Sequence, residues 1–177
     1  MDLFASAERL MGMDDATWRR HANPWSVWTR FTALPLLSLA IWSRVWIGWW
    51  SVLAVAAAAV WIWLNPRAFP PPADYGHWTS RGVLGERLWL ARDRVVIPAH
   101  HVRAAQLTTA VSALGALILL WGLVALDFSA TVGGTLLTIL GKTWFVDRMV
   151  WIHADITGTQ PGTPLPDPTL PFEKAAP

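Results

Sequence analysis

Four long apolar runs dominate the pattern of hydrophobic and polar positions along this chain. They cover residues 24–42, 45–64, 104–126 and 129–152, and are separated by two short links and one long polar stretch. A helix needs roughly 20 mainly apolar residues to cross the ~30 Å hydrocarbon layer of a bilayer. The pattern therefore predicts four membrane-spanning helices.

Turn and capping residues mark where these helices begin and end. Asn23 is a good N-cap and Pro24 suits the first helical position, so the first helix is expected to begin at Pro24. The link at residues 42–45 and the turn at residues 126–128 are so short that each pair of runs must form an antiparallel hairpin. Asn65-Pro66 is expected to end the second helix, because proline disrupts a helix interior.

The segments outside the runs complete the predicted domain organisation. Residues 1–22 are expected to form a cytoplasmic or interfacial helical segment, and residues 80–94 an amphipathic helix in the central loop. The proline-rich tail, 156–177, is expected to be disordered. The fold class predicted is all-α, an integral membrane four-helix bundle of two helical hairpins with an interfacial amphipathic helix in the central cytoplasmic loop.

The positive charges orient this bundle. Of the 14 Lys and Arg residues, only Arg44 falls on the side of the two short links. Because basic residues stay on the cytoplasmic side, both termini are predicted to be cytoplasmic in a multi-pass protein of the plasma (inner) membrane. The first 20 residues lack the apolar core of a signal peptide, so no cleavage is expected.

Composition supports the membrane interpretation and excludes some chemistry. Hydrophobic residues make up 54% of the chain and charged residues 15%, against about 25% charged residues in a soluble domain. The 14 tryptophans are expected at the two membrane interfaces. The absence of cysteine excludes disulfides and thiolate chemistry. A net charge of +2 gives no reason to expect a nucleic-acid partner.

Small residues follow one stripe on each of the last two runs. Such stripes let helices approach closely in lipid, so the third and fourth spans are predicted to pack on each other. A homodimer through the same face is an open alternative. The stripes consist of Ser112, Gly115 and Gly122, and of Thr131, Gly134, Thr138 and Gly141.

Polar residues on the predicted cytoplasmic side are the candidates for chemistry. All five histidines fall there, but no H-x-x-x-H or H-E-x-x-H spacing occurs. The side chains of the adjacent His100 and His101 are expected to diverge on a helix. No metal and no cofactor is therefore predicted.

Lys142, Asp147 and Arg148 must lie within the fourth span, because without residues 142–152 it would be too short to cross. A lysine at the centre of a span costs roughly 2.5–3.5 kcal/mol, and less if it reaches the surface. Two interpretations stay open: salt bridges that lock the bundle to the loop, or a polar pocket for a lipid headgroup or ion. The candidate polar cluster comprises His21, Asn23, Glu86, Arg87, Lys142, Asp147 and Arg148.

Three segments carry a resemblance to a known family. They are H-A-N-P-W-S-V-W-T-R at residues 21–30, N-P-R-A-F-P-P-P at 65–72 and V-L-G-E-R-L-W at 83–89. In this order they resemble the signature segments of a domain-of-unknown-function family of small prokaryotic multi-spanning membrane proteins. The resemblance runs from about Asp14 to Ile152. It implies an integral membrane protein and identifies no catalytic residue.

The sequence contains no nucleophile elbow, phosphate-binding loop or dinucleotide motif, so no motif identifies an activity. Three functional hypotheses stay open. The first is a non-enzymatic accessory, scaffold or lipid-interacting protein, with membrane lipids as partners and a homodimer or larger membrane complex as an alternative. The second is an enzyme acting on a lipid or isoprenoid substrate, with arginines binding phosphate or carboxylate and Glu86 or His21 transferring a proton. The third is a small dimeric transporter with Lys142 on its pathway.

Overall fold

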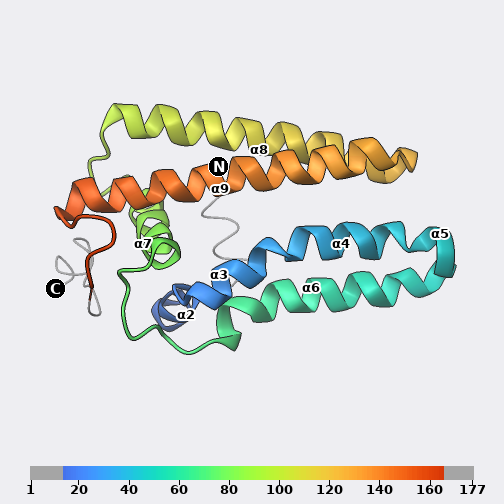
Figure 1. Cartoon of the computed structure of the whole chain (residues 1–177), viewed down its shortest axis with the longest axis horizontal. Coiled ribbons are helices and arrows are strands. Elements are labelled where there is room, and N and C mark those ends of the chain that lie inside the picture. The colour runs from blue at the N-terminus through green and yellow to red at the C-terminus, as the bar shows by residue number, and fades with distance from the viewer. Residues whose placement is uncertain (1–13, 166–177) are drawn as a thin grey trace.

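Helices are the regular elements in residues 14–165, the part of the chain that this computed structural model describes (Figure 1). The all-α class is therefore confirmed for that range. In chain order the elements are α2 (Asp15–His21), α3 (Pro24–Phe31), α4 (Ala33–Trp42), α5 (Arg44–Ile47), η1 (Gly48–Trp50), α6 (Ser51–Ala68), α7 (Trp78–Leu90), α8 (Ala99–Ala125) and α9 (Phe128–Thr157).

The first hairpin pairs α3 and α4, which follow one another, with the antiparallel α6 (Figure 1). Its start confirms the capping prediction: Asn23 Oδ1 accepts a hydrogen bond from the Trp25 amide at 2.9 Å, and Pro24 is the first helical residue. The turn is longer than the sequence suggested. Instead of beginning at residue 45, the returning helix is preceded by α5 and η1 and begins at Ser51.

The prediction that Asn65-Pro66 ends the second helix is wrong. α6 continues through Pro66 to Ala68. The side chain of Asn65 is held by hydrogen bonds to α3, and these contacts override the tendency of a residue before proline to leave the helix. The helix ends where Phe69, which precedes Pro70, becomes extended at φ −109° and ψ 149°.

The second hairpin, α8 and α9, is held together by its small residues. A Cβ atom at Gly115 would lie 2.5 Å from the Thr138 amide, and one at Gly141 would lie 2.5 Å from the Ser112 amide. The Ser112 hydroxyl also donates to the Thr138 carbonyl at 3.2 Å. The predicted packing of these two helices is confirmed. Since these glycines are buried within one chain, they are not open to a second copy.

α7 is a buried helix and not the surface amphipathic helix that the sequence suggested. It crosses the end of α9 (Figure 1), and glycines at positions 82 and 85 let the two backbones come close. Most of its residues are buried, and it ends at Leu90 instead of residue 94. We use the name cap for α2, α7, the last turns of α9 and residues 158–165.

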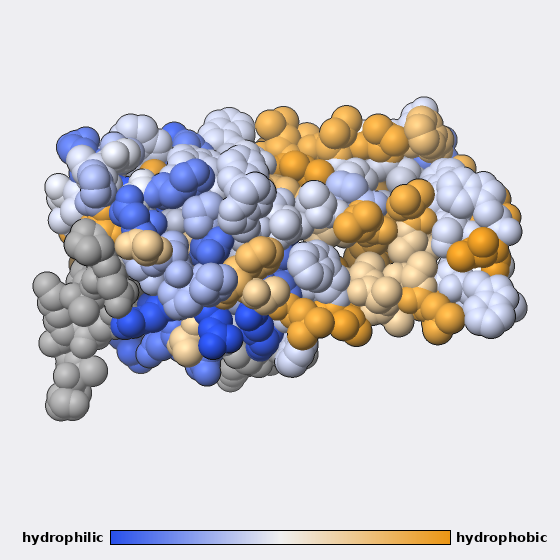
Figure 2. All heavy atoms as spheres, turned by 60° about the horizontal axis from the view of Figure 1, so that its bottom comes forward, coloured by the Kyte–Doolittle hydropathy of each residue, from blue (hydrophilic) through white to orange (hydrophobic). Residues whose placement is uncertain are grey.

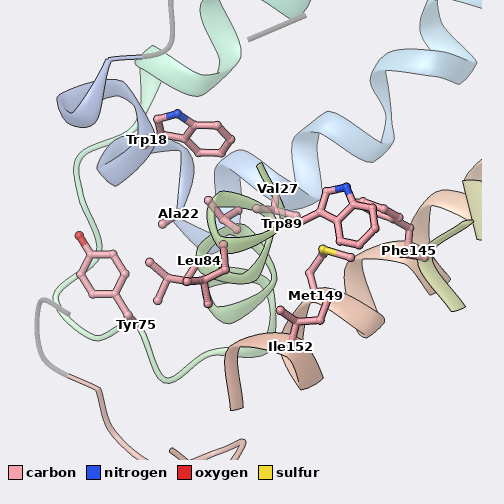
Figure 3. Close-up of a cluster of buried hydrophobic side chains, with 12 residues drawn as sticks. Trp18, Ala22, Val27, Tyr75, Leu84, Trp89, Phe145, Met149 and Ile152 are labelled. Carbon is pink, nitrogen blue, oxygen red and sulfur yellow. The ribbon is translucent and has the colours of Figure 1, made fainter. Parts of the chain in front are cut away.

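The core of the protein lies inside this cap (Figure 3). Side chains from α2, α3, α7, α8 and α9 converge there, with the Trp89 and Phe145 rings edge to face at 6.4 Å. Trp18 and Trp89 are therefore core residues, although tryptophans were expected at the membrane interfaces. The buried cluster comprises Trp18, Ala22, Val27, Tyr75, Val83, Leu84, Leu88, Trp89, Ala105, Phe145, Met149 and Ile152.

The first residues after α9 are fixed to the cap, which contradicts the prediction that the whole tail from 156 is disordered. α9 itself continues to Thr157, and the Tyr75 amide donates to the Leu165 carbonyl at 2.8 Å. Arg81, with no exposed surface, donates to the carbonyl groups of Thr159 and Thr163 at 3.1 and 2.9 Å. Residues 1–13 and 166–177, which hold the rest of both predicted terminal segments, lie outside the described residues.

The hairpins expose apolar surface away from the cap (Figure 2). Within residues 14–165, two helical stretches are long and apolar enough to cross a membrane: Pro24–Ala68, which is the folded-back first hairpin, and Ala99–Ala125. Only 6% and 28% of the most apolar part of each stretch is buried, so most of its side chains lie on the surface of the structure. The hairpins also touch far from the cap, where the Trp42 and Phe128 rings meet edge to face.

Candidate functional site

His21 lies at the centre of a polar cluster where the cap joins the first hairpin. Its Nε2 atom is 3.0 Å from an Arg30 guanidinium nitrogen and its Nδ1 atom is 3.2 Å from the Ser26 hydroxyl. A guanidinium group can only donate hydrogen bonds, so Nε2 must accept. The imidazole proton therefore sits on Nδ1 and is donated to Ser26.

The surroundings keep this imidazole neutral. Burial, followed by the positive charge of Arg30, lowers the pKa of His21 from 6.5 to about 3. Only 5% of the residue is exposed. At neutral pH the ring carries no charge, and its lone pair is occupied by Arg30.

A chain of hydrogen bonds continues from His21 into the two arms of the first hairpin. The Ser26 hydroxyl donates to Asn65 Oδ1 at 3.2 Å, and Asn65 Nδ2 donates to the Thr29 hydroxyl at 2.7 Å. Thr29 in turn donates to the Trp25 carbonyl at 2.6 Å. Asn65 has no exposed surface, so this network fixes the end of α6 against α3.

Glu86 and Lys142 form the charged part of the cluster. The Lys142 ammonium group is 3.0 Å from Glu86 Oε1, and the two side chains are 45% and 19% exposed. Burial raises the pKa of Glu86, but the opposite charge of Lys142, its hydrogen bond and the charge of Arg30 outweigh that effect and leave the pKa below its usual value. Glu86 is therefore ionised, and it ties α7 to α9.

Arg30 connects the two halves of the cluster. It donates to His21, and its charge also stabilises the Glu86 carboxylate. We use the name interface cluster for His21, Ser26, Arg30, Asn65, Glu86 and Lys142. These residues come from α2, α3, α6, α7 and α9, and the three segments that carry the family resemblance all contribute to it.

The other predicted site residues are held by separate contacts. Arg87 pairs with Asp15 of α2 at 2.5 Å, and Asn23 Nδ2 donates to the Pro70 carbonyl at 2.9 Å. Asp147 pairs with its neighbour Arg148 at 3.0 Å and accepts a hydrogen bond of 3.3 Å from Trp78 Nε1. The structure thus brings together His21, Glu86 and Lys142 from the predicted cluster, and does not add the other four to it.

Ser26, Asn65 and Arg81 are polar residues whose roles the sequence did not reveal. Ser26 and Asn65 stand inside two of the motifs, which is the available signal; no role was expected for Ser26, and Asn65 was interpreted only as part of a helix end. Arg81 gave no signal, since the residues that cover it belong to a proline-rich segment with no regular pattern. An arginine of an amphipathic surface helix would be exposed, whereas Arg81 is fully buried.

These features define an all-helical protein with two apolar hairpins and, at one end, a packed cap joined to them by a charged, hydrogen-bonded cluster. The chain belongs to the family of unknown function DUF6653, whose model matches residues 4–169. The match extends beyond both ends of the resemblance seen in the sequence. No curated protein and no solved structure matches the chain.

Proposed function

We propose that this chain is a non-enzymatic, four-span protein of the inner membrane, with both termini cytoplasmic, that binds anionic lipid headgroups at the interface cluster. The observation that carries the proposal is the position and charge of that cluster. It lies where the apolar hairpins meet the polar cap, and contains the cations Arg30 and Lys142 against the single carboxylate of Glu86.

Helix length supports four crossings. At 1.5 Å per residue, the arm formed by α3 and α4 and the arm formed by α6 each span about 27–28 Å, and α8 and α9 each exceed about 40 Å. A bilayer core of ~30 Å fits all four with some tilt. α9 exposes Val132, Leu136 and Leu140 at intervals of one helical turn, as a face toward lipid requires.

Charge supports the orientation. Of the 12 Lys and Arg residues within 14–165, Arg44 alone lies on the side of the two short links, and the others lie toward the cap. Arg44 donates to the Leu123 carbonyl and so contributes to contact between the hairpins. By the positive-inside rule, this distribution favours a cytoplasmic cap.

The uncompensated positive charge favours an anion. Lys142 is 45% exposed, so its ammonium group has donors available beyond Glu86. A phospholipid phosphate at the cytoplasmic surface lies at the depth of this cluster and attracts basic groups with about 1 kcal/mol for each Lys or Arg. The apolar faces of the hairpins would accommodate the acyl chains.

The same geometry argues against the two alternatives. His21 is neutral with its lone pair occupied by Arg30, and Glu86 is ion-paired with Lys142, so neither is poised to transfer a proton. Lys142 approaches Glu86 at the edge of the cap, a position that gives no support to a pathway through the centre of a span.

Lipids that co-purify with the chain in mild detergent test this proposal directly. Mass spectrometry should find anionic phospholipid enriched over the host membrane, and Lys142→Gln should reduce that enrichment. Lys142→Arg retains the charge and should restore it. Arg94→Gln removes an exposed charge outside the cluster and should leave it unchanged. The same lipid composition in all four proteins would refute headgroup binding at this site.

A further inference from the structure

A second group of polar side chains lies apart from the interface cluster, where α8 begins and α9 ends. His100 and His101 are the second and third residues of α8, and Asp155 is the third residue from the end of α9. One ligand atom from each of these residues lies within 4.8 Å of the other two. The group therefore brings two imidazoles and one carboxylate to a single point.

The two imidazole rings face each other, against the expectation that adjacent side chains on a helix diverge. Their centroids are 4.1 Å apart and their planes are inclined by 39°. In the first turn of a helix there is no preceding turn for a side chain to clash with, so more rotamers are allowed than in the interior. That freedom lets neighbouring histidines share one site.

The His101 and Asp155 side chains are already close to the geometry of a shared metal ion. His101 Nε2 and Asp155 Oδ2 are 2.8 Å apart. Zinc binds imidazole nitrogen and carboxylate oxygen at about 2.0–2.2 Å, so two ligand atoms on one ion lie about 3–3.5 Å apart. For a metal ion to take the place of the proton between His101 and Asp155, these two side chains must move slightly apart and the exposed His100 ring must rotate.

Burial shows that the site is anchored on one side and open on the other. His101 is 3% exposed and its Nδ1 atom has no hydrogen-bond partner among the described residues, so Nε2 provides the only polar anchor of the ring. Asp155 is 49% exposed and His100 is also exposed, which leaves solvent access for a further ligand.

We propose that His100, His101 and Asp155 bind one divalent transition-metal ion, with Zn²⁺ as the ion best matched to the site. Zinc accepts both imidazole and carboxylate, whereas Mg²⁺ prefers an all-oxygen shell. Three protein ligands leave a fourth position for water or another oxygen donor. The bound ion would staple the start of α8 to the end of α9, and this inference is independent of lipid binding at the interface cluster.

Titration of the full chain with Zn²⁺ tests the inference. The protein should carry no polyhistidine tag, and should be purified in mild detergent, stripped with a chelator and titrated by calorimetry, with metal content checked by mass spectrometry. One Zn²⁺ per chain is expected, with no comparable binding of Mg²⁺. His100→Ala and Asp155→Asn change exposed residues, and each should weaken Zn²⁺ binding at least about tenfold, since even groups that only support a ligand are worth 10–100-fold.

Matched controls separate this site from the other histidines and carboxylates. His77→Ala and Asp93→Asn alter exposed residues of the same types elsewhere and should retain the affinity of the unmodified chain for Zn²⁺. Added Zn²⁺ should also raise the melting temperature of the unmodified chain, and at the same concentration should raise that of Asp155→Asn by less. Absence of stoichiometric binding, or an affinity unchanged in both His100→Ala and Asp155→Asn, would overturn the proposal.

Discussion

The cap and the hairpins both contain many large apolar residues, but different contacts hold their helices together. In the cap, Leu88 and Met149 are fully buried, and the helices meet through large side chains. In the hairpins, leucines such as Leu117 and Leu136 are more than 60% exposed, and α8 meets α9 through glycine, serine and threonine. In water, burying a leucine is itself a driving force, whereas in lipid a leucine gains little by leaving its surroundings.

The cap and the hairpins also differ in the hydrogen bonds of their polar side chains. Polar side chains of the hairpins mostly bond locally, as when Thr135 and Thr138 donate to carbonyls one turn earlier at 2.7 Å. Those at the edge of the cap bond across elements, as in the link between Glu86 and Lys142. The polar contacts that fix the hairpins relative to the cap therefore lie where the two parts meet, at the interface cluster.

The largest predicted effect comes from the closest contact in the cap. A Cβ atom at Gly85 would overlap the carbonyl group of Met149, which is backbone and cannot move aside. Gly85→Ala should therefore lower the free energy of unfolding by about 3 kcal/mol or more, as measured by thermal or denaturant unfolding in mild detergent.

The matched control is Gly133→Ala on the outer face of α9. Nothing lies within 4 Å of a Cβ atom at Gly133, so the same substitution there should be neutral or stabilising by up to about 1 kcal/mol. Similar losses at both glycines would mean that α7 does not pack on α9 as described.

Leucine truncation is the second test of the difference between cap and hairpins. Leu88→Ala creates a cavity at a residue with no exposed surface and should cost about 3 kcal/mol of unfolding free energy. Leu136→Ala, at a residue 62% exposed, should cost under about 1 kcal/mol in detergent or lipid. If Leu136→Ala proved as costly as Leu88→Ala, that face of α9 would be a protein interface and not a lipid-facing surface.

Lowering the pH should reduce the free energy of unfolding through His21. Its pKa is about 3 in the folded chain and 6.5 when unfolded, so below pH 6.5 the unfolded state binds a proton that the folded state does not. The stabilisation is complete above pH 6.5 and is lost as the pH falls toward 3. Between pH 6 and 5 the unfolding free energy should drop by about 1 kcal/mol through this residue.

The His21→Gln variant isolates that contribution. It cannot titrate, so its stability should depend less on pH in this interval than that of the unmodified chain, when both are followed by denaturant unfolding. Parallel pH profiles for the two proteins would show that His21 is not buried in the neutral form.

The smallest predicted effect is that of the ion pair at the junction. Glu86→Gln removes the charge that pairs with Lys142, and should cost about 1 kcal/mol of unfolding free energy because both side chains are partly exposed. Asp93→Asn, at an exposed carboxylate 4.0 Å from Arg94, should be silent in the same unfolding assay. Equal effects would place Glu86 among ordinary surface charges.

The sequence predicts the hairpins better than it predicts the cap. Runs of apolar residues, the Asn23-Pro24 start and the small-residue stripes on α8 and α9 are local or periodic signals, and they identify those elements. Salt bridges between the inner end of the fourth span and the loop helix were also among the interpretations left open; the residue of α9 that pairs with Glu86 is Lys142, whereas Asp147 and Arg148 pair with each other.

The cap could not be predicted because its contacts join residues far apart in the chain. α7 was expected to have a polar surface, yet Arg81 of that helix is buried by residues about 80 positions later. Pro66 was expected to end its helix, but the neighbouring Asn65 is held by a hydrogen bond to Thr29 of a separate element, α3. The facing rings of His100 and His101 depend on rotamers at a helix start, which spacing alone does not indicate.

The claim on which the account depends most is that both hairpins cross the membrane and the cap is cytoplasmic. The chain contains no cysteine, so single cysteines provide a clean measurement. Ser129→Cys, at an exposed residue in the first turn of α9, should react with a membrane-impermeant thiol reagent in intact cells. Gln160→Cys, at an exposed residue of the cap, and Ala73→Cys, at an exposed residue beside it, should react only after the cells are opened. Labelling of Gln160→Cys in intact cells, or no labelling of Ser129→Cys before lysis, would contradict the account.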